Sequence, residues 1–173
     1  NAALQEARDQ REALLEKYTD LYDFAPVGYF SLDETGRILE VNLTGAALLG
    51  VERSRLIHRR LPRFVSPASQ PVFLAFLEQV FAGHGQRVCE AALLKKDGAT
   101  VWANFHGTSA ISLSQPQKWC RVAVSDITAL KQAEAELRVA AGRKRQAGLY
   151  PNPTLGYTGE EIRGGFARGG QQG

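Results

Sequence analysis

The chain has 173 residues, of which 44% are hydrophobic and 23% are charged, values that favour one globular domain with appendages. No apolar run approaches the roughly 18 residues of a membrane-spanning helix, and the first residues do not resemble a signal peptide. We therefore expect no membrane insertion and a cytoplasmic location, or a piece cut from a larger protein. The net charge of +3 arises entirely in residues 142–173, whereas residues 1–141 are balanced, which argues against nucleic acid as a partner.

Residues 1–22 are predicted to form a signalling or coiled-coil helix. Apolar residues recur there at three- and four-residue spacing between charges of both signs, which favours a coiled-coil partner. A helix that lies on its own domain is the alternative. The apolar stripe consists of Leu4, Ala7, Leu14, Tyr18 and Leu21.

The next residues predict strands and helices in a defined order. Strands are expected at 28–33 and 37–42 with a turn at Gly36, and 43–50 is predicted to be a short helix. Ser66-Pro67 favours the start of a longer helix that ends near Ala82, because Ser is a good N-cap and Pro is tolerated at the first position. Three further strands are expected at 87–95, 99–111 and 118–125, with an Asp97-Gly98 turn between the first two, and a second amphipathic helix follows.

This order predicts an α/β chain of the α+β type. Two consecutive strands and then three favour a five-stranded, mostly antiparallel sheet with helices on one face, flanked by N- and C-terminal amphipathic helices. Strict alternation of strands and helices is absent, which argues against a doubly wound nucleotide-binding fold.

Four strings, in this order, resemble the PAS family: APVGYFSLDETGRILEVN (25–42), AALLGVERSRLI (46–57), KKDGATVWANF (95–105) and DIT (126–128). The resemblance implies a cup-shaped sensor domain of bacterial signal transduction, such as a two-component system. Such a domain passes a signal through its flanking helices, often as a homodimer, to a histidine kinase or cyclase output domain. The family very often has Gly where this chain has His58, so either the loop there differs or His58 is a chance or engineered change.

The predicted boundaries follow from this resemblance. They are 1–22 for the N-terminal helix, 23–128 for the PAS sensor domain, 129–141 for the exit helix and 142–173 for a Gly-rich flexible tail. The tail contains nine of the 17 glycines. Its segment RQAGLYPNPTLGYTGEEIRGG (145–165) resembles part of outer-membrane efflux channel proteins, but it is too short to close a transmembrane barrel.

We expect no enzyme activity and no metal site. The three histidines fall in separate elements, no glycine loop precedes a helix, and no His or Cys residues have the spacing of metal ligands. Cys89 and Cys120 lie in apolar strand-like runs and are interpreted as small buried hydrophobes.

No cofactor is the favoured prediction. Family members that form flavin adducts carry a Cys after the first hairpin, and residues 43–65 contain none. Haem-binding members usually take an axial His from the long helix, and residues 67–82 contain none, although His84 lies just beyond. A flavin- or haem-binding redox or gas sensor stays open as an alternative, and so does a pure dimerisation module without ligand.

A candidate ligand pocket is placed on the inner face of the sheet. Side chains alternate along a strand, and alignment with the family pattern puts Val101, Ala103, Phe105 and Gly107 inward. The small residues among them are expected to leave space that the long helix borders, unless these residues simply fill a core. The candidate pocket residues are Phe64, Phe73, Phe76, Leu77, Cys89, Ala91, Ala103 and Phe105.

The outward set of the same strand suggests an interface. Trp102 and His106 would form an exposed apolar patch unless a helix or a partner covers it. The predicted dimer interface comprises Leu14, Tyr18, Leu21, Trp102 and His106. Asp126 and Thr128 are predicted to cap the exit helix and to relay sheet geometry to it.

Overall fold

A computed structural model describes residues 1–83, 85–110 and 116–149. The chain divides into two compact units, residues 1–131 and 132–173. The elements in chain order are α1 (Ala2–Asp23), β1 (Gly28–Asp33), β2 (Ile38–Val41), α2 (Leu43–Leu49), α3 (Arg53–Leu56), the 3₁₀ helix η1 (Leu61–Phe64), α4 (Gln70–Ala82), β3 (Gln86–Leu94), β4 (Thr100–Ala110), β5 (Trp119–Asp126) and α5 (Thr128–Leu149).

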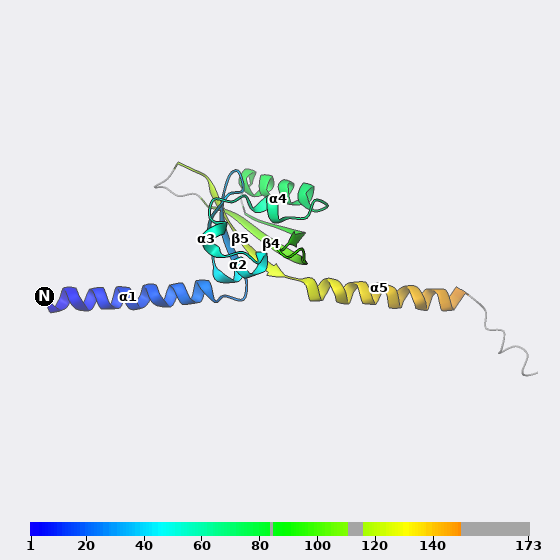
Figure 1. Cartoon of the computed structure of the whole chain (residues 1–173), viewed down its shortest axis with the longest axis horizontal. Helices are drawn as coiled ribbons and strands as arrows, with labels where there is room; N and C mark the ends of the chain where they lie inside the picture. Colours follow the sequence, from blue (N-terminus) through cyan, green and yellow to red (C-terminus); the bar gives the residue numbers. More distant parts are fainter. Residues whose placement is uncertain (84, 111–115, 150–173) are drawn as a thin grey trace, which may run out of the picture. The chain divides into compact units, whose positions relative to one another are not determined.

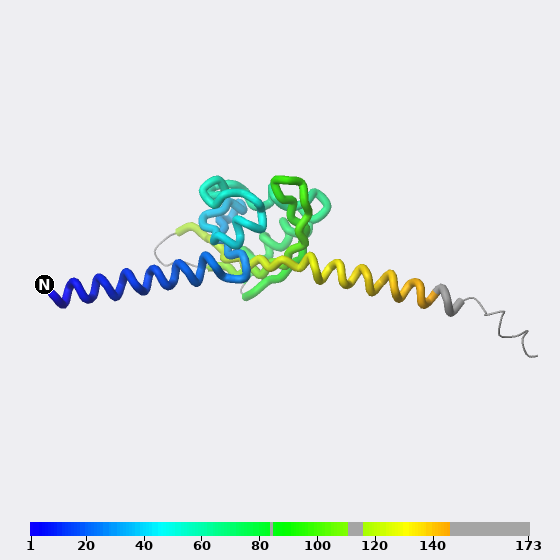
Figure 2. The backbone as a smooth tube through the Cα atoms, turned by 60° about the horizontal axis from the view of Figure 1, so that its bottom comes forward, coloured from blue at the N-terminus to red at the C-terminus, as the bar shows by residue number. Residues whose placement is uncertain are grey.

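The strands form one antiparallel sheet in the order β2-β1-β5-β4-β3, which confirms the predicted fold class. The first and last strands are neighbours at its centre, and Gly28 at the start of β1 pairs with Val124 near the end of β5. The end of α1 and the start of α5 therefore meet the same end of the sheet. Figure 2 follows the backbone from α1 into β1 and from β5 into α5.

Helices cover one face of the sheet. α4 packs on β3, β4 and β5, and α2 packs on β1 (Figure 1). Strand β4 alternates as predicted, with Val101, Ala103, Phe105 and Gly107 buried. These residues join the inward side chains of β1 and α4 in one hydrophobic core, as expected for apolar area removed from water.

The long helix begins later than predicted. α4 starts at Gln70 rather than at Ser66-Pro67, because the carbonyl of Ser66 accepts from the N–H groups of Ser69 and Gln70 in a preceding turn. Neither serine caps the helix with its side chain. The Ser69 hydroxyl instead accepts a hydrogen bond of 3.1 Å from the N–H of Ala92 on β3.

The exit helix ends later than predicted. α5 continues to Leu149, beyond the expected end at residue 141. Residues 143–147 (RKRQA) are all good helix formers, and the two glycines of this part of the helix, Gly142 and Gly148, do not outweigh them. The predicted tail and its resemblance to efflux channels lie mainly in residues 150–173, outside the described residues.

His58 adopts the left-handed backbone conformation that glycine enters most readily. Its φ is 70°, the left-handed region that a residue with a Cβ enters only at a cost in energy. The backbone N–H of His58 donates to the carbonyl of Ile38 at 2.8 Å, and the carbonyl of Arg59 accepts from the N–H of Ile38 at 2.8 Å. These hydrogen bonds hold the loop in place around His58.

Candidate functional site

Asn42 joins the end of α1 to the sheet. Its side chain is fully buried, and its Oδ1 accepts from the backbone N–H groups of Tyr29 and Gly45, each at 2.9 Å. Its Nδ2 donates to the carbonyls of Tyr22 (2.7 Å) and Val27 (3.1 Å). One amide therefore connects α1, β1 and the start of α2 with all of its main hydrogen-bonding capacity in use.

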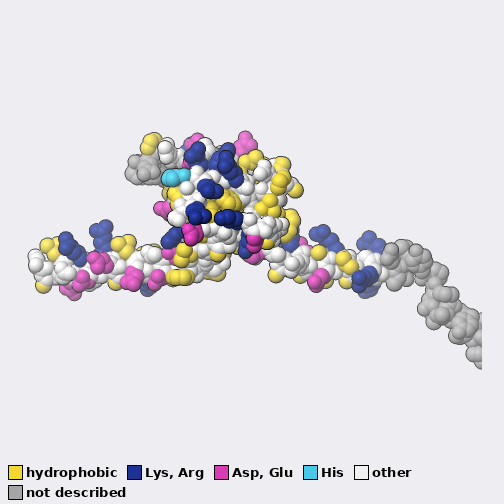
Figure 3. Space-filling model, in the orientation of Figure 1, with side chains coloured by type: hydrophobic (Ala, Val, Ile, Leu, Met, Phe, Trp, Pro, Cys, Tyr) yellow, Lys and Arg dark blue, Asp and Glu magenta, His cyan; other side chains and the backbone are white. Residues whose placement is uncertain are grey.

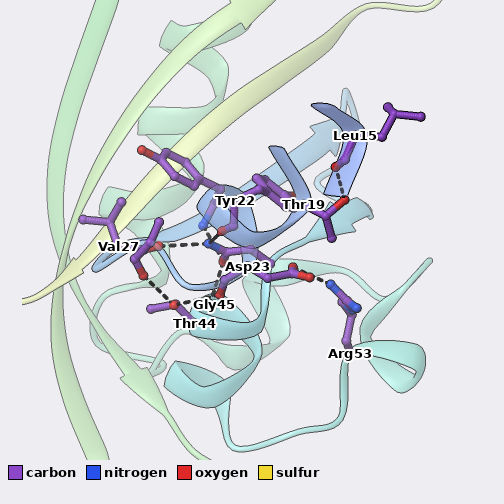
Figure 4. Close-up of polar contacts among 11 residues, drawn as sticks. Leu15, Thr19, Tyr22, Asp23, Val27, Thr44, Gly45 and Arg53 are labelled. Carbon is purple, nitrogen blue, oxygen red and sulfur yellow. Dashed lines mark hydrogen bonds and ion pairs between the residues drawn. The ribbon is translucent and has the colours of Figure 1, made fainter. Parts of the chain in front are cut away.

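Two further side chains hold the same junction. The hydroxyl of Thr44 donates to the carbonyl of Ala25 at 2.6 Å. Asp23, the last residue of α1, forms an ion pair with Arg53 of α3, with 2.6 Å between Oδ1 and Nη1. Figure 4 shows Arg53 reaching Asp23 while Thr44 faces the end of the helix. Carbonyl groups at the end of α1 thus accept hydrogen bonds from side chains of the domain. In a free helix these last carbonyls would be hydrogen-bonded only by water.

The first turn of α5 is attached to β4. The carboxylate of Asp126 accepts from the N–H of Thr128 at 2.9 Å, the capping contact that the sequence predicts. The hydroxyl of Thr128 instead accepts from the N–H of Trp102 at 3.1 Å, and the N–H of Ile127 donates to the carbonyl of Trp102 at 2.8 Å. Strand β4 therefore fixes where α5 begins.

Lys131 strengthens this second junction from the next turn. Its Nζ lies 2.6 Å from a carboxylate oxygen of Glu90 on β3 and 5.5 Å from the centroid of the Trp102 ring. An ammonium at this distance from an indole face makes a favourable cation–π contact. Trp102 is 38% exposed, so a charged side chain of α5 covers part of the predicted apolar patch.

The candidate pocket residues lie together on the inner face, as core. Phe73 and Phe105 pack edge to face with ring centroids 5.0 Å apart, and Phe76 lies 5.8 Å from Phe73. Leu77, Ala91 and Ala103 are buried with them, while Phe64 and Cys89 are half-buried at the periphery. These residues contact one another, which favours the core interpretation over the pocket.

The space that the small residues were expected to leave is occupied. A Cβ added at Gly107 would lie 2.7 Å from Cζ of Phe76 and 2.8 Å from Cγ2 of Val80. The Phe76 ring therefore sits directly against the backbone of β4. A flavin or haem ring system does not fit there without displacing this ring, and His84 lies outside the described residues.

Burial raises the pKa of both cysteines, although Cys89 is half-buried and Cys120 is fully buried. Burial, with a smaller contribution from Glu90, raises the pKa of Cys89 to about 11. Burial raises the pKa of Cys120 to about 12, against an opposing hydrogen bond from the backbone of Leu32. Neither thiol is ionised near neutral pH, so neither is a ready nucleophile.

Four of the five predicted dimer residues are exposed, three on α1 and Trp102 on β4. Leu14, Tyr18 and Leu21 on α1 are 55%, 65% and 64% exposed. His106 on β4 is half-buried and contacts Asn104 of its own strand at 3.1 Å. A groove of about 380 Å³ on the outer sheet face is bordered by His106 together with Tyr22, the residue of α1 that stacks on Tyr29.

Some classes of site are not represented in the part of the chain that the structure describes. There, no three His, Cys, Asp or Glu side chains are grouped as a metal site requires. No helix within the described ranges combines the length and the apolar composition of a bilayer span.

The fold and these junctions define a class: an α+β domain with a helix fixed at each end of its central strands. The family sequence pattern described as PAS fold matches residues 9–120. The chain belongs to the PAS family. No curated protein matches it significantly in sequence.

Many solved structures are similar to this chain, among them the following three. A PAS domain of an HTR-like protein from Haloarcula marismortui is 21% identical, with a TM-score of 0.62, and the match covers 71% of this chain and 99% of that one. A sensory box histidine kinase/response regulator from Burkholderia thailandensis is 18% identical, with a TM-score of 0.60 and coverage of 75% and 98%. An RNA-binding light-oxygen-voltage receptor is 15% identical, with a TM-score of 0.63 and coverage of 75% and 37%. At these identities the likeness concerns the fold.

Proposed function

We propose that the chain is a non-catalytic, cytoplasmic sensory input module. It relays a change in its sheet through α1 and α5 to an output domain such as a histidine kinase or a cyclase. The observation that carries this proposal is the pairing of β1 with β5, which brings both helix junctions to one end of the sheet. The sensory box histidine kinase among the similar structures supports this class of output domain.

The relay would run along β4. Phe105 and Gly107 of this strand pack in the core, and Trp102 of the same strand holds Thr128 and Ile127 at the start of α5. A shift of β4 caused from the core would therefore displace the first turn of α5. Asp126 would keep that turn capped as it moves.

The packed core determines which input is favoured. Since Phe76 fills the space beside Gly107, we expect no internal cofactor and an input that reaches the sheet from outside or moves α4. The same packing favours a second candidate function, a dimerisation module that binds no ligand. Visible flavin or haem bands in the absorption spectrum of the purified protein would contradict both.

Amide hydrogen exchange distinguishes the two candidates. Gly107→Ala forces Phe76 or Val80 to shift and so disturbs β4. In a relay, the N–H groups of Trp102 and Ile127 then exchange about fivefold faster, the change that ~1 kcal/mol produces. Val88→Ala, on an exposed position of β3, is the control and should leave them unchanged. Changes confined to the core would favour the dimerisation module.

We also propose a homodimer formed through the apolar stripe of α1, with Trp102 and His106 beside it. A lone helix cannot bury this stripe, and a two-fold pair would. Light scattering of the full chain at tens of micromolar should give a dimer, and Leu14→Asp/Tyr18→Asp should give a monomer. The control Gln5→Asp/Ala13→Asp changes the charge equally on the other side of the helix. A monomeric wild type would end the dimer proposal.

A further inference from the structure

The chain carries an exposed patch of arginines between α3 and η1. Residues 53–63 contain five arginines and no acidic residue. We define the arginine surface as the arginines of this segment other than Arg53, which pairs with Asp23, together with one residue of the adjoining hairpin: Arg55, Arg59, Arg60, Arg63 and Arg37. Figure 3 shows Lys and Arg side chains gathered on the face of the domain where Figure 1 places α3.

The backbone brings two of these arginines directly opposite each other. Arg37 and Arg60 form an antiparallel bridge, and the flanking hydrogen bonds run from Ile38 N–H to the Arg59 carbonyl (2.8 Å) and from Leu61 N–H to the Gly36 carbonyl (2.9 Å). This is a non-hydrogen-bonded pair, the position in which side chains come closest. Like charges in such a pair are destabilising, so an anion beside them would be favourable.

Few ion pairs engage the arginine surface, although Glu34 and Glu78 border the same hollow as Arg60, whose Nε donates to the Thr35 carbonyl at 3.0 Å. Within the described residues its one ion pair joins Arg55 to Glu52 at 3.9 Å, between two exposed side chains. Asp33 lies near Arg37, but its carboxylate already accepts from the backbone N–H groups of Thr35 and Arg37 and from the Thr35 hydroxyl. Guanidinium groups therefore remain available for a partner.

Helix α1 carries the complementary charge. Asp9, Glu12, Glu16 and Asp20 are three or four residues apart and so share one side of the helix, which we call the acidic face. It lies opposite the apolar stripe. All four side chains are exposed, and none forms an ion pair among the described residues. Residues 1–23 carry six acidic and three basic side chains, whereas residues 24–141 carry ten and 13.

One contact between the two charge systems already exists within the chain. Asp23 lies three residues beyond Asp20 on the same side of the helix and pairs with Arg53, the first arginine of the segment. The side chain of Asp23 is only 9% exposed. A carboxylate from this side of α1 thus fits a guanidinium of α3. Arginine suits carboxylates because its planar fork can donate two parallel hydrogen bonds.

We propose that the arginine surface of one copy of this chain binds the acidic face of α1 of another copy. The contact joins two different surfaces, so it can extend from copy to copy. It leaves the apolar stripe free and does not depend on the proposed dimer. Because exposed charges are screened within about 8 Å at physiological ionic strength, the association should weaken strongly with salt.

Sedimentation velocity of the full chain tests the proposal with a charge exchange. The wild type should at least double its weight-average mass between about 0.3 M and 0.01 M salt, where the screening length grows to ~30 Å. Arg59→Glu/Arg63→Glu and Glu12→Lys/Glu16→Lys should each lose this increase when measured alone. An equimolar mixture of the two variants should regain it, since native surfaces meet native ones and reversed surfaces meet reversed ones.

Controls separate this contact from general charge effects and from the dimer. Arg87→Glu/Lys96→Glu makes the same charge change at exposed positions elsewhere and should associate like the wild type. Leu14→Asp/Tyr18→Asp should abolish the dimer but retain the salt-dependent increase. A wild-type mass independent of salt, or a mixture that does not recover, would overturn the proposal. So would a short RNA that binds through Arg59 and Arg63 while the protein alone shows no increase.

Discussion

Replacing Phe76 with alanine is expected to lower the free energy of unfolding by about 3–5 kcal/mol, the range of large-to-small changes in a core. The side chain is 3% exposed, and its ring contacts Phe73, Phe105 and the backbone at Gly107. Truncation removes this burial and leaves a cavity beside β4 that the surrounding structure closes only in part. Chemical denaturation monitored by circular dichroism measures the change.

A double-mutant cycle identifies the contact responsible. Gly107→Ala should destabilise the wild type, because the new methyl group meets Phe76 at 2.7 Å, and should cost less in the Phe76→Ala protein. Leu74→Ala, on an exposed position of the same helix, is the control and should cost less than 1 kcal/mol. An unchanged stability of Phe76→Ala would place this side chain outside the core.

Asn42→Ala is expected to destabilise the protein by about 3 kcal/mol or more, since each buried polar group left unpaired costs about 1–3 kcal/mol. The substitution removes the partner of the Tyr29 and Gly45 N–H groups and of the Tyr22 and Val27 carbonyls. The end of α1 should also lose its attachment, which hydrogen exchange at its last turn would detect.

Two variants make this prediction specific. Asn42→Asp keeps an oxygen that accepts from the Tyr29 and Gly45 N–H groups and loses the NH₂ group that donates to the two carbonyls, so its stability should lie between those of the wild type and the alanine variant. Asn1→Ala removes an exposed cap, a 3.1 Å contact with Ala3, and should cost no more than about 1 kcal/mol. Equal costs for Asn1→Ala and Asn42→Ala would show that the junction contributes nothing beyond ordinary capping.

Sequence patterns predicted the sheet because local chemistry determines it. The period-two burial of β4 and the Asp97-Gly98 turn, where Gly98 has a φ of 90°, need no distant partner. The start of α4 escaped prediction because the Ser69 hydroxyl binds β3, which lies far away in sequence. The conformation of His58 escaped it because pairing with Ile38 outweighs the preference of a single residue.

The junctions were only partly visible in the sequence. Asp126 was recognised as a cap, and Asn42 stands before a helix, which is the usual place for a capping side chain. Its donation to α1 could not be read from that position, because it joins segments 20 residues apart. The same holds for the pairs Asp23–Arg53 and Trp102–Thr128, which form only when distant strands and helices come together.

The attachment at Tyr22 also sets the rotational phase of α1. Because Asn42 and Arg53 hold the last turn, the direction in which each earlier side chain of α1 points is fixed by its distance in sequence from that turn. One residue inserted within α1 would turn the preceding part of the helix by about 100° relative to the sheet and leave the junction intact. Seven inserted residues would restore the phase to within about 20°. The orientation of any domain joined before α1, relative to this sheet, would therefore be preserved when α1 is lengthened or shortened by seven residues and changed by most other lengths.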